Sequence, residues 1–416
     1  MTKHKAILSV IAIVLATPFA LQAQETLALE PAASPAADLV TAVTRAPALT
    51  AARARVEAAH ARLGASGKFP DPTLEGMVSR RNTPTENMPM WEVTVRQPLP
   101  KSGERAADRE RAQAVLAMAS AEFAVMAGEM ATDTAMALAE AATAQRRVDA
   151  LAAQIDRTVR VLSTIDARIA TGQGRFGDRL ALQTRIAGMQ LMLERERRMN
   201  ADALSEARGL LGLRPDIPLP AFAAPATADI DPEHAPALSV AEAKTAEARA
   251  MARMARASAK PMTAVGLRFE REQERMGNND TVGLSFMTEL PWRGRRYARA
   301  EERAAQAEAT AALADADTTR YRIVAALSRV ERAERLAEVS QRLAQETHRR
   351  LDAEYDTLVR SAGTSAMGND SSVLMILEVL EKTTDAQLQA IDAEGSALVA
   401  RAELWRYSPA HRFPSP

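Results

Sequence analysis

The same order of landmarks occurs twice in this chain, with the second copy about 190 residues after the first. The landmarks are proline and glycine positions whose neighbours also recur, and three of the pairs are Ala46–Leu49 with Ala235–Leu238, Leu99–Pro100 with Leu290–Pro291, and Gly172 with Gly363. Between the copies, residues 214–236 contain six prolines, which is typical of a linker. The chain is therefore expected to fold as two copies of one supersecondary unit.

Each copy is predicted to begin with a helix, continue through two short strands, and end in a very long helix and a shorter one. The long helices stand out because residues 104–170 contain no proline, and residues 295–360 contain neither proline nor glycine. At 1.5 Å per residue each would reach about 100 Å. The other helices are predicted over 37–66, 178–211, 238–259 and 373–405.

Four short runs alternate between apolar and polar residues, which is the pattern of a half-buried strand. They cover 73–80, 90–96, 263–270 and 282–288, and polar loops join them into two hairpins. Four strands cannot close a barrel, and an open edge in lipid leaves backbone groups without hydrogen-bond partners. Three chains would supply twelve strands with an apolar outer face and a polar lumen. Trp91 and Trp292 lie near opposite ends of their strands, where membrane-interface aromatics occur, with ordinary packing as the alternative.

Residues 1–23 have the composition of a secretory signal peptide, with Lys3 and Lys5 ahead of an apolar run over 6–16. That run is shorter than the ~20 apolar residues that span a bilayer as a helix. We expect no later stretch to be long and apolar enough to span a bilayer as a helix, so an integral form of the mature chain would use β-strands. The remaining expected segments are a first repeat at 24–213, a linker at 214–236, a second repeat at 237–405 and a tail at 406–416.

Composition argues against several classes of function. The 53 basic and 53 acidic residues cancel, so the chain has no net positive field to attract nucleic acid. It has no cysteine, which excludes disulfides, thiol enzymes and iron–sulfur clusters, and its five histidines are scattered. Residues 172–177 match G-x-G-x-x-G but follow a helix rather than a strand, so they are no dinucleotide fingerprint. Met88 and Met90 could bind a soft metal, although loop or lipid-facing packing is the more usual role. We expect no enzyme, no cofactor and no metal site.

Three local patterns add to the duplicated order. Phe69–Pro72 ends the first helix before a strand, Gln97–Gly103 leads out of the first hairpin, and Glu289–Gly294 repeats that exit. With these patterns, the chain resembles the TolC-like outer-membrane efflux family over nearly its whole mature length. The resemblance implies a mainly α fold with membrane β-strands: a homotrimer whose twelve-stranded β-barrel lies in the outer membrane of a Gram-negative bacterium and continues as an α-helical tunnel across the periplasm.

The resemblance also implies partners. The tunnel would dock on a periplasmic adaptor (membrane fusion) protein driven by an inner-membrane pump of the RND type. Within the family, the short chain and short extracellular hairpins resemble the heavy-metal efflux members of the RND systems more than the drug efflux or type I secretion members. The chain would then be a passive exit duct for metal ions or small toxic compounds. A type I secretion duct and an exported structural coiled-coil protein without a pore stay open as alternatives. The adaptor itself is a weaker alternative, since no lipoyl-like β domain is visible.

Members of the family contact the adaptor at the two turns between the long helices and the returning ones. The resemblance maps those contacts onto residues of both turns: Thr171, Gly172, Gly174, Asp178, Ala362, Gly363 and Thr364. A tight turn would need glycine here as well, and the two roles are compatible.

Glu378 and Glu381 follow the second turn and are three residues apart, so they face one side of a helix. Family members carry an acidic pair at this point, around the closed tunnel entrance. In a trimer these carboxylates would form a ring, which we expect to attract cations and to act as the tunnel gate. A solvated helix face is the alternative.

Overall fold

A computed structural model describes residues 35–413 except 83–86, 173, 275–276, 290–293 and 365–370. The expected signal peptide and Trp292 therefore lie outside the described residues. The helices are α1 (Pro35–Arg45), α2 (Thr50–Ala65), α3 (Glu104–Ala170), α4 (Phe176–Leu211), α5 (Pro236–Ser258), α6 (Gly294–Thr364) and α7 (Ser371–Ala402). The strands are β1 (Thr73–Asn82), β2 (Asn87–Leu99), β3 (Met262–Glu274) and β4 (Gly277–Glu289). This order confirms the duplicated helix, β-hairpin, long helix and helix.

The first predicted helix is broken into two pieces. Ala46 has an extended backbone with ψ of 138°, and Pro47 follows it. A proline disfavours the helical conformation of the residue before it, so α1 ends and α2 begins after a short turn. The single helix expected over 37–66 is therefore wrong at this point.

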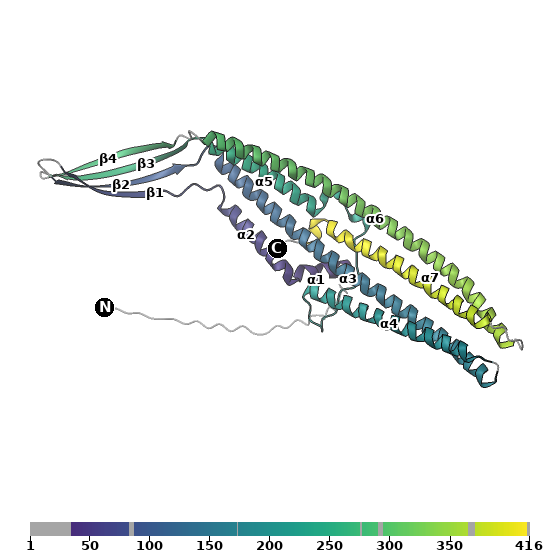
Figure 1. Cartoon of the computed structure of the whole chain (residues 1–416). Coiled ribbons are helices and arrows are strands. Elements are labelled where there is room, and N and C mark those ends of the chain that lie inside the picture. Colours follow the sequence, from purple (N-terminus) through teal and green to yellow (C-terminus); the bar gives the residue numbers. More distant parts are fainter. Residues whose placement is uncertain are drawn as a thin grey trace, which may run out of the picture. The chain divides into compact units, whose positions relative to one another are not determined.

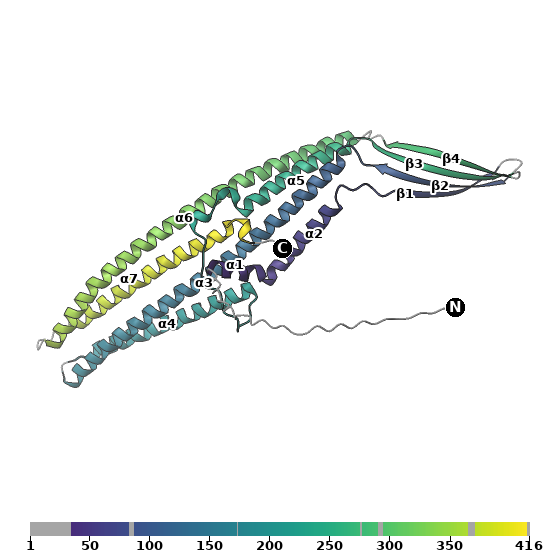
Figure 2. The ribbon, with the colours of Figure 1, turned by 180° about the vertical axis from the view of Figure 1, so that it is seen from behind.

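Helix α3 is the centre of the helical part. It packs against α4 and α7 along one half and against α2 and α5 along the other, and α6 packs against both α5 and α7. Figures 1 and 2 show these long helices side by side. The contact faces of α3 are lined by alanine, which lets neighbouring helices approach closely on several sides.

Helix α3 also contains an 18-residue window with a mean hydropathy of 1.4 and no more than 2 charged residues. By length and composition it could cross a membrane, so the expectation that no later stretch is apolar enough is wrong. About half of the window, 44%, is buried inside the chain's own fold. A core helix passes the same test, and α3 is the helix that the others cover.

The largest apolar cluster joins the two ends of the described chain. Leu39 of α1, Phe123 of α3, Trp405 and Phe413 are all buried in it. The indole Nε1 of Trp405 donates a hydrogen bond of 2.9 Å to the carbonyl of Ala223 in the proline-rich linker. The linker and the C-terminal segment are thus held against α3.

The four strands form one antiparallel sheet in the order β1-β2-β3-β4. The central pairing of β2 with β3 joins the two repeats, with Trp91 opposite Arg271 and Thr94 opposite Arg268. Strands β1 and β4 are the two edges. The strands are longer than the predicted runs, reaching 13 residues in β2, β3 and β4, because polar residues continue the alternation beyond the apolar part. In Figure 1 the sheet lies beyond the ends of α3, α5 and α6.

Candidate functional site

One face of the sheet is apolar and open to the surroundings. Val78 on edge strand β1 is 86% exposed, and Leu284 on edge strand β4 is 84% exposed. The other exposed apolar side chains of this face are Leu74, Val95, Leu99, Val265, Leu267, Val282 and Phe286. Soluble monomers rarely expose an apolar surface of this extent, so the face is expected to meet another protein or lipid.

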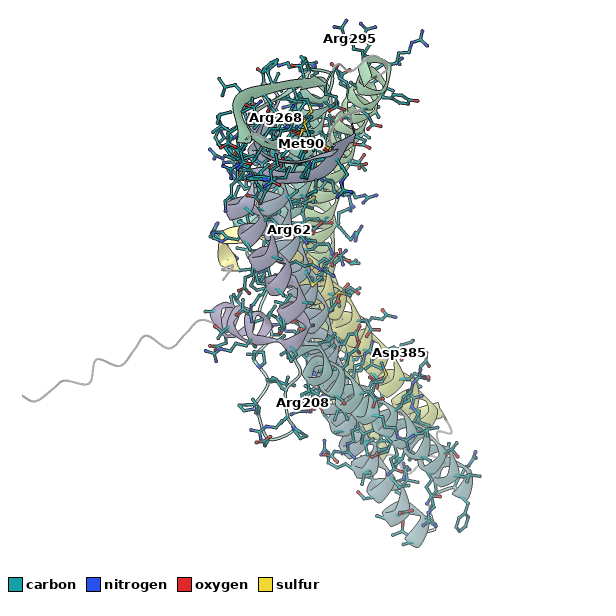
Figure 3. The ribbon with its side chains drawn as sticks, turned by 90° about the vertical axis from the view of Figure 1, so that its left-hand side faces the viewer. Arg62, Met90, Arg208, Arg268, Arg295 and Asp385 are labelled. Atoms are coloured by element: carbon teal, nitrogen blue, oxygen red, sulfur yellow. The ribbon has the colours of Figure 1, made fainter. Side chains whose placement is uncertain are left out.

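The opposite face of the sheet is polar and its charges are paired. The Arg268 guanidinium lies 2.9 Å from a carboxylate oxygen of Glu92 and 2.8 Å from one of Glu270. The hydroxyl of Thr94 donates to Glu92 at 3.0 Å. Figure 3 looks along the sheet and places Arg268 and Met90 on the inside of its curve. A wall of this kind tolerates water and carries both signs of charge.

Trp91 lies on the apolar face, toward the tip of the first hairpin. Its ring packs on Phe269 with centroids 5.3 Å apart, and the Arg271 guanidinium lies 5.6 Å from its centroid. Arg271 in turn donates to Asp280 at 2.5 Å. An aromatic ring with a polar border suits a membrane interface. That role remains a prediction for Trp91.

The first helical turn has the geometry of a tight connection. Gly172 has φ of 76°, a left-handed conformation that favours glycine, and its amide donates to the carbonyl of Ile169 at 3.0 Å. A Cβ on Gly174 would come within 2.7 Å of the backbone nitrogen of Ile169. Both glycines are thus needed by the turn itself. Thr171 is exposed, and Asp178 lies in the first turn of α4, where a carboxylate suits the helix dipole.

Sequence reasoning missed an apolar pair beside this turn. Phe176 and Leu180 are both strongly exposed and lie one helical turn apart on α4. Their spacing in the sequence could have indicated them. In the second turn, the backbone of Ala362, Gly363 and Thr364 ends α6, and their side chains lie outside the described part of the chain.

The two predicted gate carboxylates are exposed, and each has a basic partner. Glu378 is 61% exposed and lies 2.7 Å from the ammonium of Lys382, which hydrogen-bonds to its carboxylate and lowers its pKa. Glu381 is 56% exposed and lies 3.3 Å from the Arg185 guanidinium on α4. The two acids therefore have different structural partners: Glu378 forms an ion pair within α7, whereas Glu381 joins α7 to α4.

Four ion pairs join the hairpin of α3 and α4 to the hairpin of α6 and α7, and only the Glu381 end of one was foreseen. They are Arg146–Glu394, Arg147–Asp392, Arg157–Asp352 and Arg185–Glu381. In each pair the cation belongs to the first hairpin and the acid to the second. A buried hydrogen bond adds to them, because Gln154 donates to the Leu380 carbonyl at 3.0 Å. We call these five contacts the hairpin latch.

Only part of this arrangement could be predicted from the sequence. Lys382 stands four residues after Glu378, a spacing that indicates an ion pair on a helix. Arg185 and Gln154 lie about 200 residues from their partners, so no local pattern marks them. Among the described residues, no group of three or more histidine or acidic side chains could hold a metal ion.

Residues 39–213 match the sequence model of a family described as outer membrane efflux protein. That range covers most of the first repeat and 175 of the chain's 416 residues. No curated protein matches the sequence.

Solved structures with the same fold cover nearly the whole chain. The outer-membrane channel OprN superposes with a TM-score of 0.69 at 18% identity, over 91% of this chain and 91% of its own. The outer membrane protein VceC of Vibrio cholerae gives 0.68 at 16%, over 89% and 95%. The MtrE outer membrane channel of Neisseria gonorrhoeae, in its open state, gives 0.64 at 14%, over 92% and 91%. These likenesses show the fold of this chain.

Proposed function

We propose that three copies of this chain form a passive exit duct across the outer membrane. The observation that carries the proposal is the sheet, with one exposed apolar face, one charge-paired polar face and two edge strands. In lipid, each unpaired backbone group on an edge costs several kcal/mol. Pairing β4 of one copy with β1 of the next removes every edge and puts the apolar face toward lipid.

The polar face then becomes the wall of a water-filled lumen. Its arginines and glutamates neutralise one another, as Arg268 does with Glu92 and Glu270. Such a wall selects little by charge. The choice of cargo therefore belongs to the pump, and metal ions or small toxic compounds suit an open aqueous path equally well.

The hairpin latch is proposed to hold the periplasmic entrance closed. Opening would move the hairpin of α6 and α7 away from α3 and α4, and that movement breaks the latch contacts. Glu381 takes part directly through Arg185, whereas Glu378 contributes charge near the entrance. Transport energy would come from the partner pump. A partner that binds the entrance would shift the equilibrium between its closed and open states only by binding one of them better.

The partners are proposed to be a periplasmic adaptor and an inner-membrane pump of the RND type. The adaptor would contact both turns. The contacts lie on Thr171, Gly172, Gly174 and Asp178 in the first turn and on Ala362, Gly363 and Thr364 in the second. The exposed pair Phe176 and Leu180 beside the first turn offers the adaptor an apolar anchor. In that arrangement the glycines shape the turn and the neighbouring side chains make the contacts.

Reconstitution into planar lipid bilayers tests the proposal. The full-length protein, purified in detergent, should insert as trimers and give discrete, long-lived conductance steps. A protein that stays soluble as a helical rod, or that binds bilayers without conductance, would refute it.

A further inference from the structure

A group of exposed cations begins helix α6. Arg295, Arg296 and Arg299 are all exposed, and Tyr297 between them is 73% exposed. Among the residues that the structure describes, none of the three guanidinium groups has a carboxylate partner. The first turn of α6 also contains no acidic residue.

The position is unfavourable for cations within the protein itself. The first turn of a helix carries the positive end of its dipole, so positive side chains there are destabilising. Arg295 and Arg296 lie in this turn and Arg299 lies just beyond it, and the three guanidinium groups repel one another. Among the described residues no carboxylate forms an ion pair with them, so an anion from outside the protein would relieve this repulsion.

The first repeat supplies an internal comparison at the same point. Helix α3 begins with Glu104, whose carboxylate accepts a hydrogen bond of 2.8 Å from the backbone of Lys101. Arg105, which aligns with Arg296, lies 4.1 Å above the Phe69 ring and donates to the Gly67 carbonyl at 2.7 Å. In the first copy these residues hold the chain together, whereas in the second copy their counterparts are directed to the surroundings.

The cations lie where the apolar face of the sheet ends. Strand β4 presents Leu284 and Phe286 on that face and ends at Glu289, five residues before α6 begins at Gly294. Figure 1 shows the first turns of α6 close to this end of the strands, and Figure 3 shows Arg295 outside the curve of the sheet. If the apolar face lies in lipid, this is the level of the phospholipid headgroups on the helical side.

We propose that Arg295, Arg296 and Arg299 bind the phosphate groups of anionic phospholipids in the periplasmic leaflet of the outer membrane. Guanidinium groups bind phosphate through paired hydrogen bonds, and the exposed Tyr297 ring has the amphipathic character of an interfacial side chain. The contact fixes the depth of the sheet in the membrane. The inference rests on the proposed function, because it needs the apolar face to lie in lipid.

Native mass spectrometry of the detergent-purified full-length protein tests the proposal, with phosphatidylglycerol or phosphatidylcholine added. The test variant replaces Arg295, Arg296 and Arg299 together with glutamine. The matched control replaces three arginines of the same helix that already pair with a glutamate one turn earlier: Arg335, Arg342 and Arg350. Both variants lose the same charge.

Wild type and control should bind phosphatidylglycerol in preference to phosphatidylcholine, and the test variant should lose that preference. A cation near an anionic headgroup contributes about fivefold in affinity, so three should contribute roughly a hundredfold. Equal binding by wild type and test variant would overturn the proposal. So would an equal loss in the control, or displacement of the lipid by millimolar inorganic phosphate, which would indicate a simple anion site.

The same samples separate this inference from the proposed function. If all three proteins form conducting channels but none prefers phosphatidylglycerol, only the lipid inference fails. If wild type neither inserts nor conducts, the exit duct itself fails. A single Arg296→Gln variant is expected to lose about fivefold in affinity for phosphatidylglycerol, and it keeps the test valid if the triple variant misfolds.

Discussion

Replacing Glu381 with glutamine should open the periplasmic entrance more often, whereas the same change at Glu378 should not. Glu381 pairs with Arg185 across the two hairpins at 3.3 Å, but Glu378 pairs with Lys382 inside α7. Only the first pair must break when the hairpins separate. The two variants lose the same charge within one helical turn, so Glu378→Gln is the matched control.

The size of the effect follows from the exposure of the pair. Exposed ion pairs contribute about 0.2–1 kcal/mol. If three copies open together, the contributions add to roughly 0.6–3 kcal/mol, which changes the open-to-closed ratio by about threefold to a hundredfold. High salt should shrink the effect, because exposed charges are screened.

Single-channel recording in planar bilayers measures this ratio directly. Glu381→Gln should raise the open probability and Glu378→Gln should leave it within twofold of wild type. The charge-swapped double variant Arg185→Glu with Glu381→Arg should restore closure. Equal effects of the two glutamines, or a swap that stays open, would contradict the hairpin latch.

Three further predictions concern packing, the membrane face and pH. Gly128→Ala should lower the midpoint of thermal unfolding by the equivalent of about 1–3 kcal/mol, because its Cβ would come within 2.9 Å of a backbone oxygen of the C-terminal segment. The control Gly188→Ala has open space around the added methyl group and should stabilise the protein by up to about 1 kcal/mol. Leu284→Arg should cost up to about 2–4 kcal/mol in lipid and reduce insertion, as measured by the membrane-bound fraction, while arginine on the polar face should not. Because the pKa of Glu378 is lowered, its ion pair with Lys382 stabilises α7 at pH values above the ordinary glutamate pKa. This stabilisation is lost as the pH falls through the lowered pKa. Lys382→Met should return the pKa of Glu378 to its ordinary value, as measured by carboxyl NMR.

The duplicated pattern made most of the fold predictable. Helix α3 has the predicted bounds because Gly103 precedes it, Gly172 follows it and no proline interrupts it. The break before Pro47 was missed because alanine-rich sequence on both sides favours helix. The strands were underestimated for a related reason: the polar residues that extend β3 to Glu274 are typical of a loop until a partner strand is known.

The candidate site was less predictable than the fold. Residues of the turns could be proposed from glycine positions, and Lys382 could have been found from its spacing to Glu378. The other partners come from distant parts of the chain. Arg185 and Gln154 meet α7 only because α3 and α4 lie alongside it, and that packing has no signature in a single sequence.

Disulfide cross-linking in the outer membrane tests the central claim most directly, since the chain contains no cysteine of its own. One cysteine replaces Met77 on β1 and another replaces Gly283 or Ser285 on β4. Within one copy these positions are separated by two strands, or about 14 Å, which is too far for a disulfide. Closure by sister copies predicts a covalent ladder that ends at three chains. Oxidised samples that stay monomeric at every cysteine pair, or a ladder that continues past three, would contradict the shared barrel.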